Sequence, residues 1–221
     1  MSIVVGLVLV AGVLGVAVVM RTLAGDQAAP QVESHTAQIA YEGDFALERP
    51  ATPRPQWKRG DLPWLYQTDS QWAGTSYAGS DVKMSGCGPT CLTMVYIWAT
   101  GKTDMTPADM ARFSEQNGYV QEEMTAWALM DKGAAQLGLT STGVQLTADA
   151  VTAALGAGQP VIVSVRPGTF TTVGHFMVLG GLTTDGKVIL HDPNSATNSM
   201  TYWDVQQILD EANVAWTYTL S

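Results

Sequence analysis

Ser85-Gly86-Cys87-Gly88-Pro89-Thr90 is the most informative segment of the sequence, because it predicts a cysteine at the amino end of a helix. Pro89 suits a first helical turn, apolar residues follow it, and Gly101 is a typical helix end, so we predict a helix over residues 88–100. Unpaired backbone N–H groups and the helix dipole at that end favour the thiolate form of Cys87. An unpaired cysteine is more often a buried apolar residue, so its position alone assigns it no role.

Two further residues share this chemistry although they lie far along the chain. His175 stands in Gly174-His175-Phe176, and Asp192 stands in His191-Asp192-Pro193. We predict strands over 175–182 and 187–191, joined by a turn that contains an Asp-Gly hairpin signal. The two residues then lie at the same open end of the hairpin, within hydrogen-bonding reach of each other.

The carboxylate of Asp192 could fix the tautomer of His175 and stabilise its imidazolium form. Together with Cys87, this pair would make an activated thiol nucleophile. Each residue also has a plainer interpretation, His175 as a core histidine and Asp192 as a turn residue before proline. His191 points to the opposite face of its strand and is the weaker base, and His35 lies in a polar spacer.

The order of the predicted elements indicates an α+β fold, with helices first and antiparallel strands second. Beyond the elements above, we predict helices over 106–116, 122–137, 147–155 and 203–211, and strands over 160–165 and 215–220. The segment 114–132, with Trp127 and several methionines, belongs to the core or to the wall of a cleft, and core is the commoner outcome for such spacing.

Acyl transfer through a thiol needs hydrogen-bond donors for the developing oxyanion. A glutamine upstream of Cys87 and the Cys87 backbone N–H could supply them, and Gln67 and Gln71 are equally suitable in chemical terms. Cys91 lies one turn beyond Cys87, too far for an unstrained disulfide within one helix, and fits a buried role. The cysteine spacing does not resemble a zinc site, and we expect no metal or organic cofactor.

Composition and charge narrow the class of protein. The chain has 221 residues, 46% hydrophobic and 14% charged, which suits a globular domain with appended segments. A formal net charge of -9 and the lack of a basic stripe argue against nucleic-acid binding.

The first part of the chain differs in composition from the rest. Residues 3–20 are an unbroken apolar run that ends at Arg21, just long enough for a membrane helix. Arg21 alone would place the domain in the cytoplasm. We nevertheless expect an extracytoplasmic domain, either anchored by this segment or released after Ala24 or Ala29. The predicted organisation is a signal or anchor segment (1–25), a polar proline-containing spacer (26–60) and a folded domain (61–221).

Five motifs in this order give the sequence a resemblance to a known family. They are Tyr66-Gln67-x-Asp69-x-x-Trp72, the segment 85–90, Gly158-Gln159-Pro160-Val161-Ile162-Val163, Gly174-His175-Phe176 and Asp192-Pro193-Asn194. Over residues 62–220 the chain resembles the bacteriocin-leader-peptidase-like group of papain-type cysteine peptidases (family thirty-nine of the cysteine peptidases). The segment around Cys87 is the most specific of the five.

The resemblance implies a papain-like fold, with Cys87 as nucleophile, His175 as general base and then acid, Asp192 as orienting carboxylate and Gln67 in the oxyanion hole. It thereby prefers Gln67 over Gln71. Leader-processing members are fused to export ATPases, and this sequence contains no P-loop, so the stand-alone members are the nearer comparison.

The resulting expectation is an extracytoplasmic thiol peptidase that acts on a peptide or protein substrate, cell-wall peptide included, and contacts the membrane through its N-terminal segment. Two alternatives remain open at this point. One is a catalytically inactive surface module that binds peptide or cell-wall material. The other is a related cell-wall amidase or transpeptidase.

Overall fold

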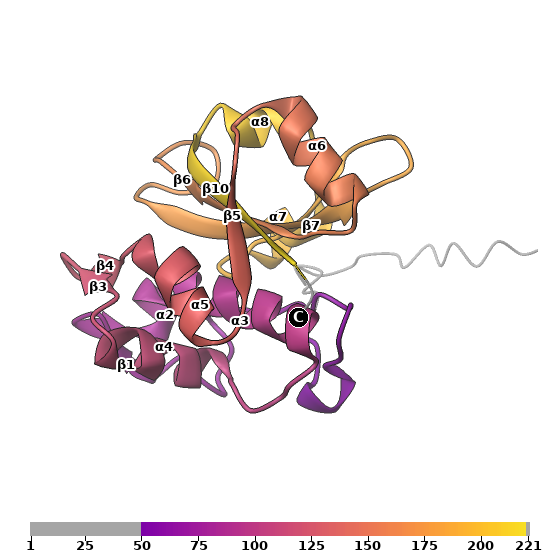
Figure 1. The fold of residues 1–221 in the computed structure, drawn as a ribbon. Helices are drawn as coiled ribbons and strands as arrows, with labels where there is room; N and C mark the ends of the chain where they lie inside the picture. The colour runs from indigo at the N-terminus through magenta and orange to yellow at the C-terminus, as the bar shows by residue number, and fades with distance from the viewer. Residues whose placement is uncertain (1–49, 220–221) are drawn as a thin grey trace, which may run out of the picture. The chain divides into compact units, whose positions relative to one another are not determined.

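The computed structural model describes residues 50–219, which form the predicted α+β fold. Helices from the first part of this region pack on one face of an antiparallel sheet from the second part, and α6 and α8 cover the opposite face (Figure 1). The sheet has six strands in the order β5-β10-β6-β7-β8-β9. The bounds of these strands are β5 Thr140–Val144, β6 Val161–Val165, β7 His175–Leu182, β8 Val188–His191, β9 Tyr202–Trp203 and β10 Ala212–Thr219.

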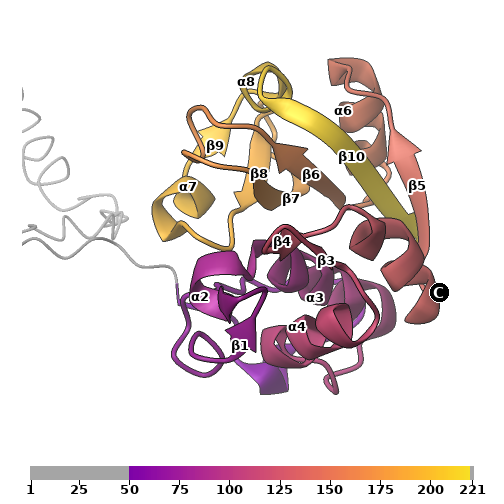
Figure 2. The same ribbon diagram turned by 90° about the vertical axis from the view of Figure 1, so that its left-hand side faces the viewer.

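Several of the helices lie where local sequence signals place them. Figure 2 shows α2, α3 and α4 gathered on one side of the sheet. The bounds are α2 Val82–Ser85, α3 Cys87–Thr100, α4 Pro107–Gln116, α5 Ala134–Gln136, α6 Ala148–Gly156, α7 Ala196–Met200 and α8 Val205–Leu209, with a short 3-10 helix, η1, at Arg54–Gln56. Thr106 and Asp109 form a capping box at the start of α4, and Thr147 caps α6.

The predicted helix over 88–100 is confirmed as α3. Gly101 ends it in the left-handed conformation, with φ 70°, and its N–H bonds to the carbonyl of Ile97. Almost every residue of α3 is buried, so the helix is apolar on all sides because it lies inside the core and not on its surface. This helix therefore gives Cys87 a rigid support.

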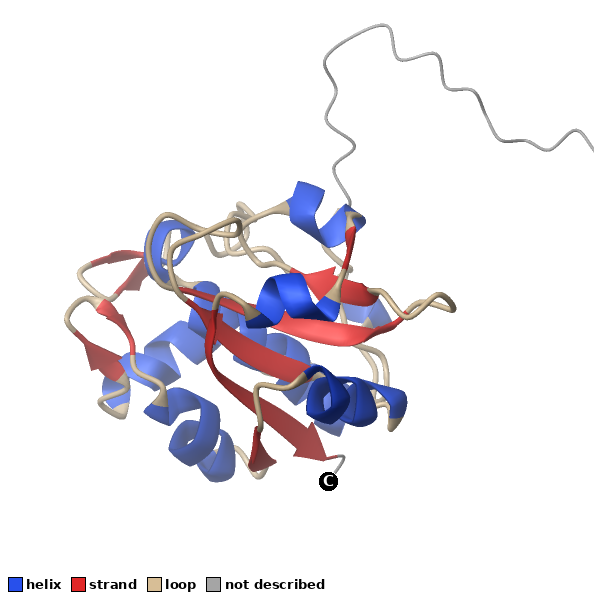
Figure 3. Ribbon diagram, turned by 90° about the horizontal axis from the view of Figure 1, so that it is seen from above, coloured by secondary structure: helices blue, strands red, loops and turns tan. Residues whose placement is uncertain are grey.

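The sheet is buried on both faces, which explains its continuous apolar runs. Ile162, Val178 and Trp216 belong to the cluster that includes α3, whereas Val163 and Met177 belong to the cluster that includes α6 and α8. In Figure 3 the strands run between these two groups of helices. The strand ends that carry the candidate residues are thereby held from both sides.

The predicted helix over 122–137 is wrong in its first half. A short hairpin of β3 (Val120–Gln121) and β4 (Met124–Thr125) stands there, followed by a π-helix, η2, at Leu129–Gly133 and then α5. Gly118, with φ 73°, reverses the chain before β3. A hydrogen bond between the hydroxyls of Thr125 and Tyr77 holds this hairpin, and no local sequence pattern predicts such a tertiary contact.

The other differences are elements that were not predicted and element ends that are shifted. Strand β5 and helix α7 were not predicted, the helix expected over 203–211 begins at Val205, and the last strand begins at Ala212, which pairs with Val165 before a bulge. Residues 52–60, expected in the spacer, lie against the domain. Trp57 is part of the core, and the N–H of Thr52 bonds to the carbonyl of Trp64.

The apolar run over 3–20 lies outside the described residues. Within residues 50–219, the helices are too short or too polar to cross a bilayer.

Candidate active site

Cys87 is the first residue of α3, and two glycines allow its surroundings to close tightly. A Cβ on Gly86 would lie 2.4 Å from the carbonyl oxygen of Val82, where α2 turns into α3. A Cβ on Gly88 would lie 2.5 Å from a methyl carbon of Thr125. Glycine is required at both positions by packing within the protein, which brings the β3–β4 hairpin against the helix start beside the sulfur.

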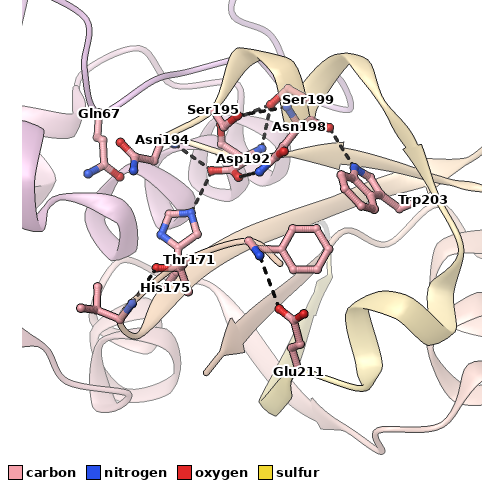
Figure 4. Close-up of polar contacts among 12 residues, drawn as sticks. Gln67, Thr171, His175, Asp192, Asn194, Ser195, Asn198, Ser199, Trp203 and Glu211 are labelled. Carbon is pink, nitrogen blue, oxygen red and sulfur yellow. Dashed lines mark hydrogen bonds and ion pairs between the residues drawn. The ribbon is translucent and has the colours of Figure 1, made fainter. Parts of the chain in front are cut away.

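His175 and Asp192 meet at the end of the sheet as the hairpin topology predicts. His175 begins β7 and Asp192 directly follows β8, and both side chains are buried. The Nε2 atom of His175 lies 2.8 Å from Oδ1 of Asp192 (Figure 4). Because Asp192 takes Nε2, Nδ1 is the ring nitrogen left to interact with a thiol.

Asp192 is itself fixed by several donors. Its Oδ1 also accepts the backbone N–H of Asn194 at 2.9 Å, and its Oδ2 accepts Nδ2–H of Asn198 at 2.8 Å. The hydroxyl of Ser199 accepts the backbone N–H of Asp192 at 2.9 Å. The short helix α7 thus holds the carboxylate against the imidazole, a support that the sequence alone did not reveal.

The contact between Cys87 and His175 changes the protonation of both. Burial alone would raise the pKa of the Cys87 thiol, but a hydrogen bond to His175, its positive charge and backbone N–H groups together hold this pKa below its ordinary value. Burial alone would lower the pKa of His175, whereas the hydrogen bonds to Asp192 and Cys87 raise it. A thiolate–imidazolium pair is the state that these shifts favour.

This pair gives a measurable reactivity. At about pH 6.5 we expect Cys87 to react with iodoacetamide at least about tenfold faster than free cysteine, whose thiol is then largely protonated. As the pH falls, the rate decreases only once the pH passes below the lowered pKa of Cys87. His175→Ala should bring the rate back toward that of free cysteine. Equal rates in the two proteins would contradict an activated pair.

Two asparagine variants test whether α7 positions the carboxylate of Asp192. Asn198→Ala is expected to slow this alkylation at about pH 6.5 several-fold, since Asp192 can then turn from His175 and the pKa of the imidazolium falls. Asn194→Ala is the control, because Asn194 gives Asp192 only its backbone N–H. Equal slowing in both variants would mean that the side chain of Asn198 does not position the carboxylate.

The structure distinguishes the two glutamine candidates. Gln67 is buried, its backbone N–H bonds to the carbonyl of Pro193, and its Nε2 donates to the carbonyl of Lys83 at 2.7 Å. The Lys83 carbonyl can only accept, so it fixes the orientation of the amide and leaves the second N–H for another partner. Gln67 Oε1 has no hydrogen-bond partner within residues 50–219. Gln71 is exposed and bonds to Asp69.

The remaining candidates lie apart from this cluster. His191 is buried and stacks on Trp64, with ring centroids 3.6 Å apart. Cys91 is fully buried, and burial raises its pKa well above the ordinary value. Both cysteines are free thiols. Residues 50–219 contain no group of three or more His, Cys, Asp and Glu side chains that could hold a metal ion.

A cleft of about 560 Å³ opens beside Cys87 and His175. Its size suits a bound segment of peptide. Five residues of the β3–β4 region line it, and the sequence alone assigned none of them to the site: Glu122, Glu123, Met124, Thr125 and Trp127. The sequence left open whether the segment 114–132 belongs to the core or to the wall of a cleft, and both occur: Trp127 lies in the cleft wall and Met130 lies in the core. The sequence signal for these residues was weak: two adjacent glutamates stand shortly before Trp127.

An α+β fold that places a thiol and an imidazole in one cleft, with a buried carboxylate bonded to the imidazole, is the arrangement of papain-type cysteine peptidases. The chain belongs to the Peptidase_C39 like family, whose model matches residues 60–220. No match was found among curated proteins.

Two peptidases are among the solved structures that are similar to the chain. One is the peptidase domain of Streptococcus ComA, described as a bi-functional ABC transporter involved in a quorum-sensing pathway. It is 19% identical, with a TM-score of 0.47, and the match covers 62% of this chain and 93% of that one. The other is a C39-like peptidase from Bacillus anthracis, 15% identical, with a TM-score of 0.43, covering 73% of this chain and 96% of that one. The family match is what assigns the chain.

Proposed function

We propose that this protein is a thiol-dependent peptidase that hydrolyses peptide bonds through an acyl-enzyme. The single observation that carries the proposal is the convergence of Cys87, His175 and Asp192 beside one cleft, with the 2.8 Å contact between the last two. Membership of a peptidase family supports the same reaction class. In this proposal Cys87 is the nucleophile, His175 the acid–base group and Asp192 the orienting carboxylate.

The steps follow from the protonation of the pair. The Cys87 thiolate attacks the peptide carbonyl carbon, and the imidazolium of His175 gives its proton to the departing amine nitrogen as the C–N bond breaks. His175 then takes a proton from water, whose oxygen attacks the thioester. The C–S bond breaks and restores the Cys87 thiolate beside the imidazolium, and the released carboxylic acid loses its proton to solvent. Asp192 holds the ring and stabilises its charged form throughout.

Gln67 is proposed to share the oxyanion with the Cys87 backbone N–H. The proposal is supported by the buried amide of Gln67, which has one Nε2–H on Lys83 and a second available. Donors fixed before the reaction stabilise the developing charge more than mobile ones, because they need no reorganisation.

The proposed place of action is outside the cytoplasm, on a membrane anchor or after secretion. The apolar run over 3–20 in the sequence supports it. A substrate there would be a peptide or protein, and cell-wall peptide is one candidate.

Product analysis tests the reaction class. The full-length protein is incubated in ¹⁸O-labelled water with a peptide library and, separately, with peptidoglycan fragments, and the products are identified by mass spectrometry. A peptidase yields peptides whose new carboxyl groups carry the label. Release of peptide from a sugar would indicate an amidase, transfer to an added amine a transpeptidase, and binding without products a non-catalytic module; each would replace the proposal.

A further inference from the structure

The exposed apolar side chains of this domain gather at the proposed active site. Within residues 50–219, six large hydrophobic side chains are exposed, and four of them line the cleft beside Cys87. These four are Met84 (70% exposed), Met124 (53%), Trp127 (51%) and Val173 (63%). Single exposed apolar residues are ordinary, but a concentration around one cleft marks a surface that a ligand covers.

Trp127 is held as a fixed platform in this wall. Its Nε1–H donates to the hydroxyl of Ser164 at 3.2 Å, and its ring packs edge-on against Trp216, with centroids 6.4 Å apart. The indole is thus oriented by contacts on one side while about half of it remains exposed. A rigid aromatic surface of this kind binds an apolar side chain at a low cost in conformational entropy.

Apart from the proposed catalytic pair, the charged side chains that line the cleft are all negative. Glu122 and Glu123 line it, and no Lys or Arg does so within the described part of the chain. The side chains of both glutamates lack a hydrogen bond or ion pair with another residue of the described range 50–219. Both have positive φ, 49° and 59°, at a turn where asparagine and glycine are usual. Two carboxylates therefore stand at the cleft with no internal partner.

The position of this acidic turn is fixed relative to the sulfur. The hydroxyl of Tyr77 lies 2.8 Å from Oγ1 of Thr125 and 2.9 Å from Oγ of Ser114, which ties the base of the hairpin to α4. Gly88 admits Thr125 next to the helix start. The turn, the Trp127 platform and Cys87 consequently belong to one rigid surface.

We propose that the cleft selects a peptide segment in which a bulky apolar side chain stands next to a basic one. Trp127 and Met124 contact the apolar side chain, and the carboxylates of Glu122 and Glu123 attract the basic one. The inference rests on the proposed function of the same site and names its substrate class. We assign a basic residue to this position by charge complementarity, because the two carboxylates would attract a basic side chain and repel an acidic one.

The test uses three peptides with a central phenylalanine and a neighbouring arginine, glutamine or glutamate. We expect the full-length protein to cleave the arginine peptide with the highest kcat/KM. In the Glu122→Gln, Glu123→Gln double variant the preference for arginine over glutamine should fall about tenfold, as two partly exposed ion pairs allow. The variant Asp61→Asn, Asp149→Asn removes two exposed charges elsewhere and is the matched control, with its preference retained. Added salt should also weaken the preference.

A parallel series replaces phenylalanine by alanine in the arginine peptide, and Trp127→Ala should reduce the preference for phenylalanine about tenfold. Binding of the same peptides to the Cys87→Ala protein separates this inference from the proposed reaction. Selective binding of the arginine peptide without turnover by the unmodified protein would support the inference and contradict the peptidase. Turnover with no preference, a preference unchanged by the glutamate substitutions, or no binding at all would overturn the inference.

Discussion

Replacing Cys87 with alanine is expected to lower the rate of peptide hydrolysis at least about 10⁴-fold, because no second thiol lines the cleft to form the acyl-enzyme. The chain offers a matched control in Cys91, which lies one turn further along α3 and is fully buried. Cys91→Ala removes one sulfur from the core at a cost of ~1 kcal/mol in unfolding free energy. It should retain most of the activity.

The measurement is kcat/KM on one cleaved peptide, with the thermal unfolding midpoint of each variant as a control for folding. His175→Ala should cause a loss of similar size, and the Cys87→Ala, His175→Ala double variant should be no worse than either single one, because the two groups act as one unit. Two losses that add would contradict the shared mechanism. Full activity in Cys87→Ala would end the proposal.

Replacing Gly88 with alanine is expected to damage the site without touching any reacting group. The new methyl would lie 2.5 Å from a methyl carbon of Thr125 and 2.8 Å from its hydroxyl oxygen, so the hairpin must move off the helix start. Overpacking of this kind costs about 1–3 kcal/mol in unfolding free energy. It should also weaken the bond between Tyr77 and Thr125 and lower kcat/KM about 10²-fold, as the cleft wall shifts.

Gly156→Ala is the control for this variant. Nothing lies within 4 Å of a Cβ built at Gly156, at the end of α6, so alanine should leave activity unchanged and alter the unfolding free energy by about 0.5 kcal/mol or less. Denaturant unfolding and peptide hydrolysis measure the two effects. Wild-type activity and stability in Gly88→Ala would show that the hairpin adapts and that the close approach does not shape the cleft.

The sequence predicted those parts of the fold whose signals are local. Pro89 and Gly101 bound α3, and the Asp-Gly turn between β7 and β8 brings His175 and Asp192 to one edge. A hairpin places its two open ends together whatever the rest of the fold does. The sequence alone was therefore enough to predict that His175 and Asp192 lie next to each other.

The β3–β4 hairpin escaped prediction because its determinants are not local. Its strands have two residues each, too few for alternation, and its turn is Glu122-Glu123 in place of an asparagine–glycine pair. The contact that holds it comes from Tyr77, 48 residues away. Met124 and Trp127 looked like one face of a helix, although both are exposed at the cleft.

The candidate site likewise contains residues that local sequence signals predict and residues that only the tertiary structure identifies. The residue types and the order of motifs nominated Cys87, His175 and Asp192, but chemistry alone left Gln67 and Gln71 equal. Burial and the Lys83 carbonyl distinguish the two in the structure. Asn198 donates a hydrogen bond to Asp192 from helix α7, and no strong sequence pattern predicted that helix.

Strand β10 lies between β5 and β6, although it is the last strand described along the chain. It supplies Trp216 and Tyr218 to the core and is the neighbour of the strand that pairs with β7. During synthesis, Cys87 leaves the ribosome long before this strand does. Until β10 has been made, the sheet that carries His175 lacks one of its inner strands, so we expect the Cys87 thiol of the nascent chain to have the reactivity of an ordinary cysteine.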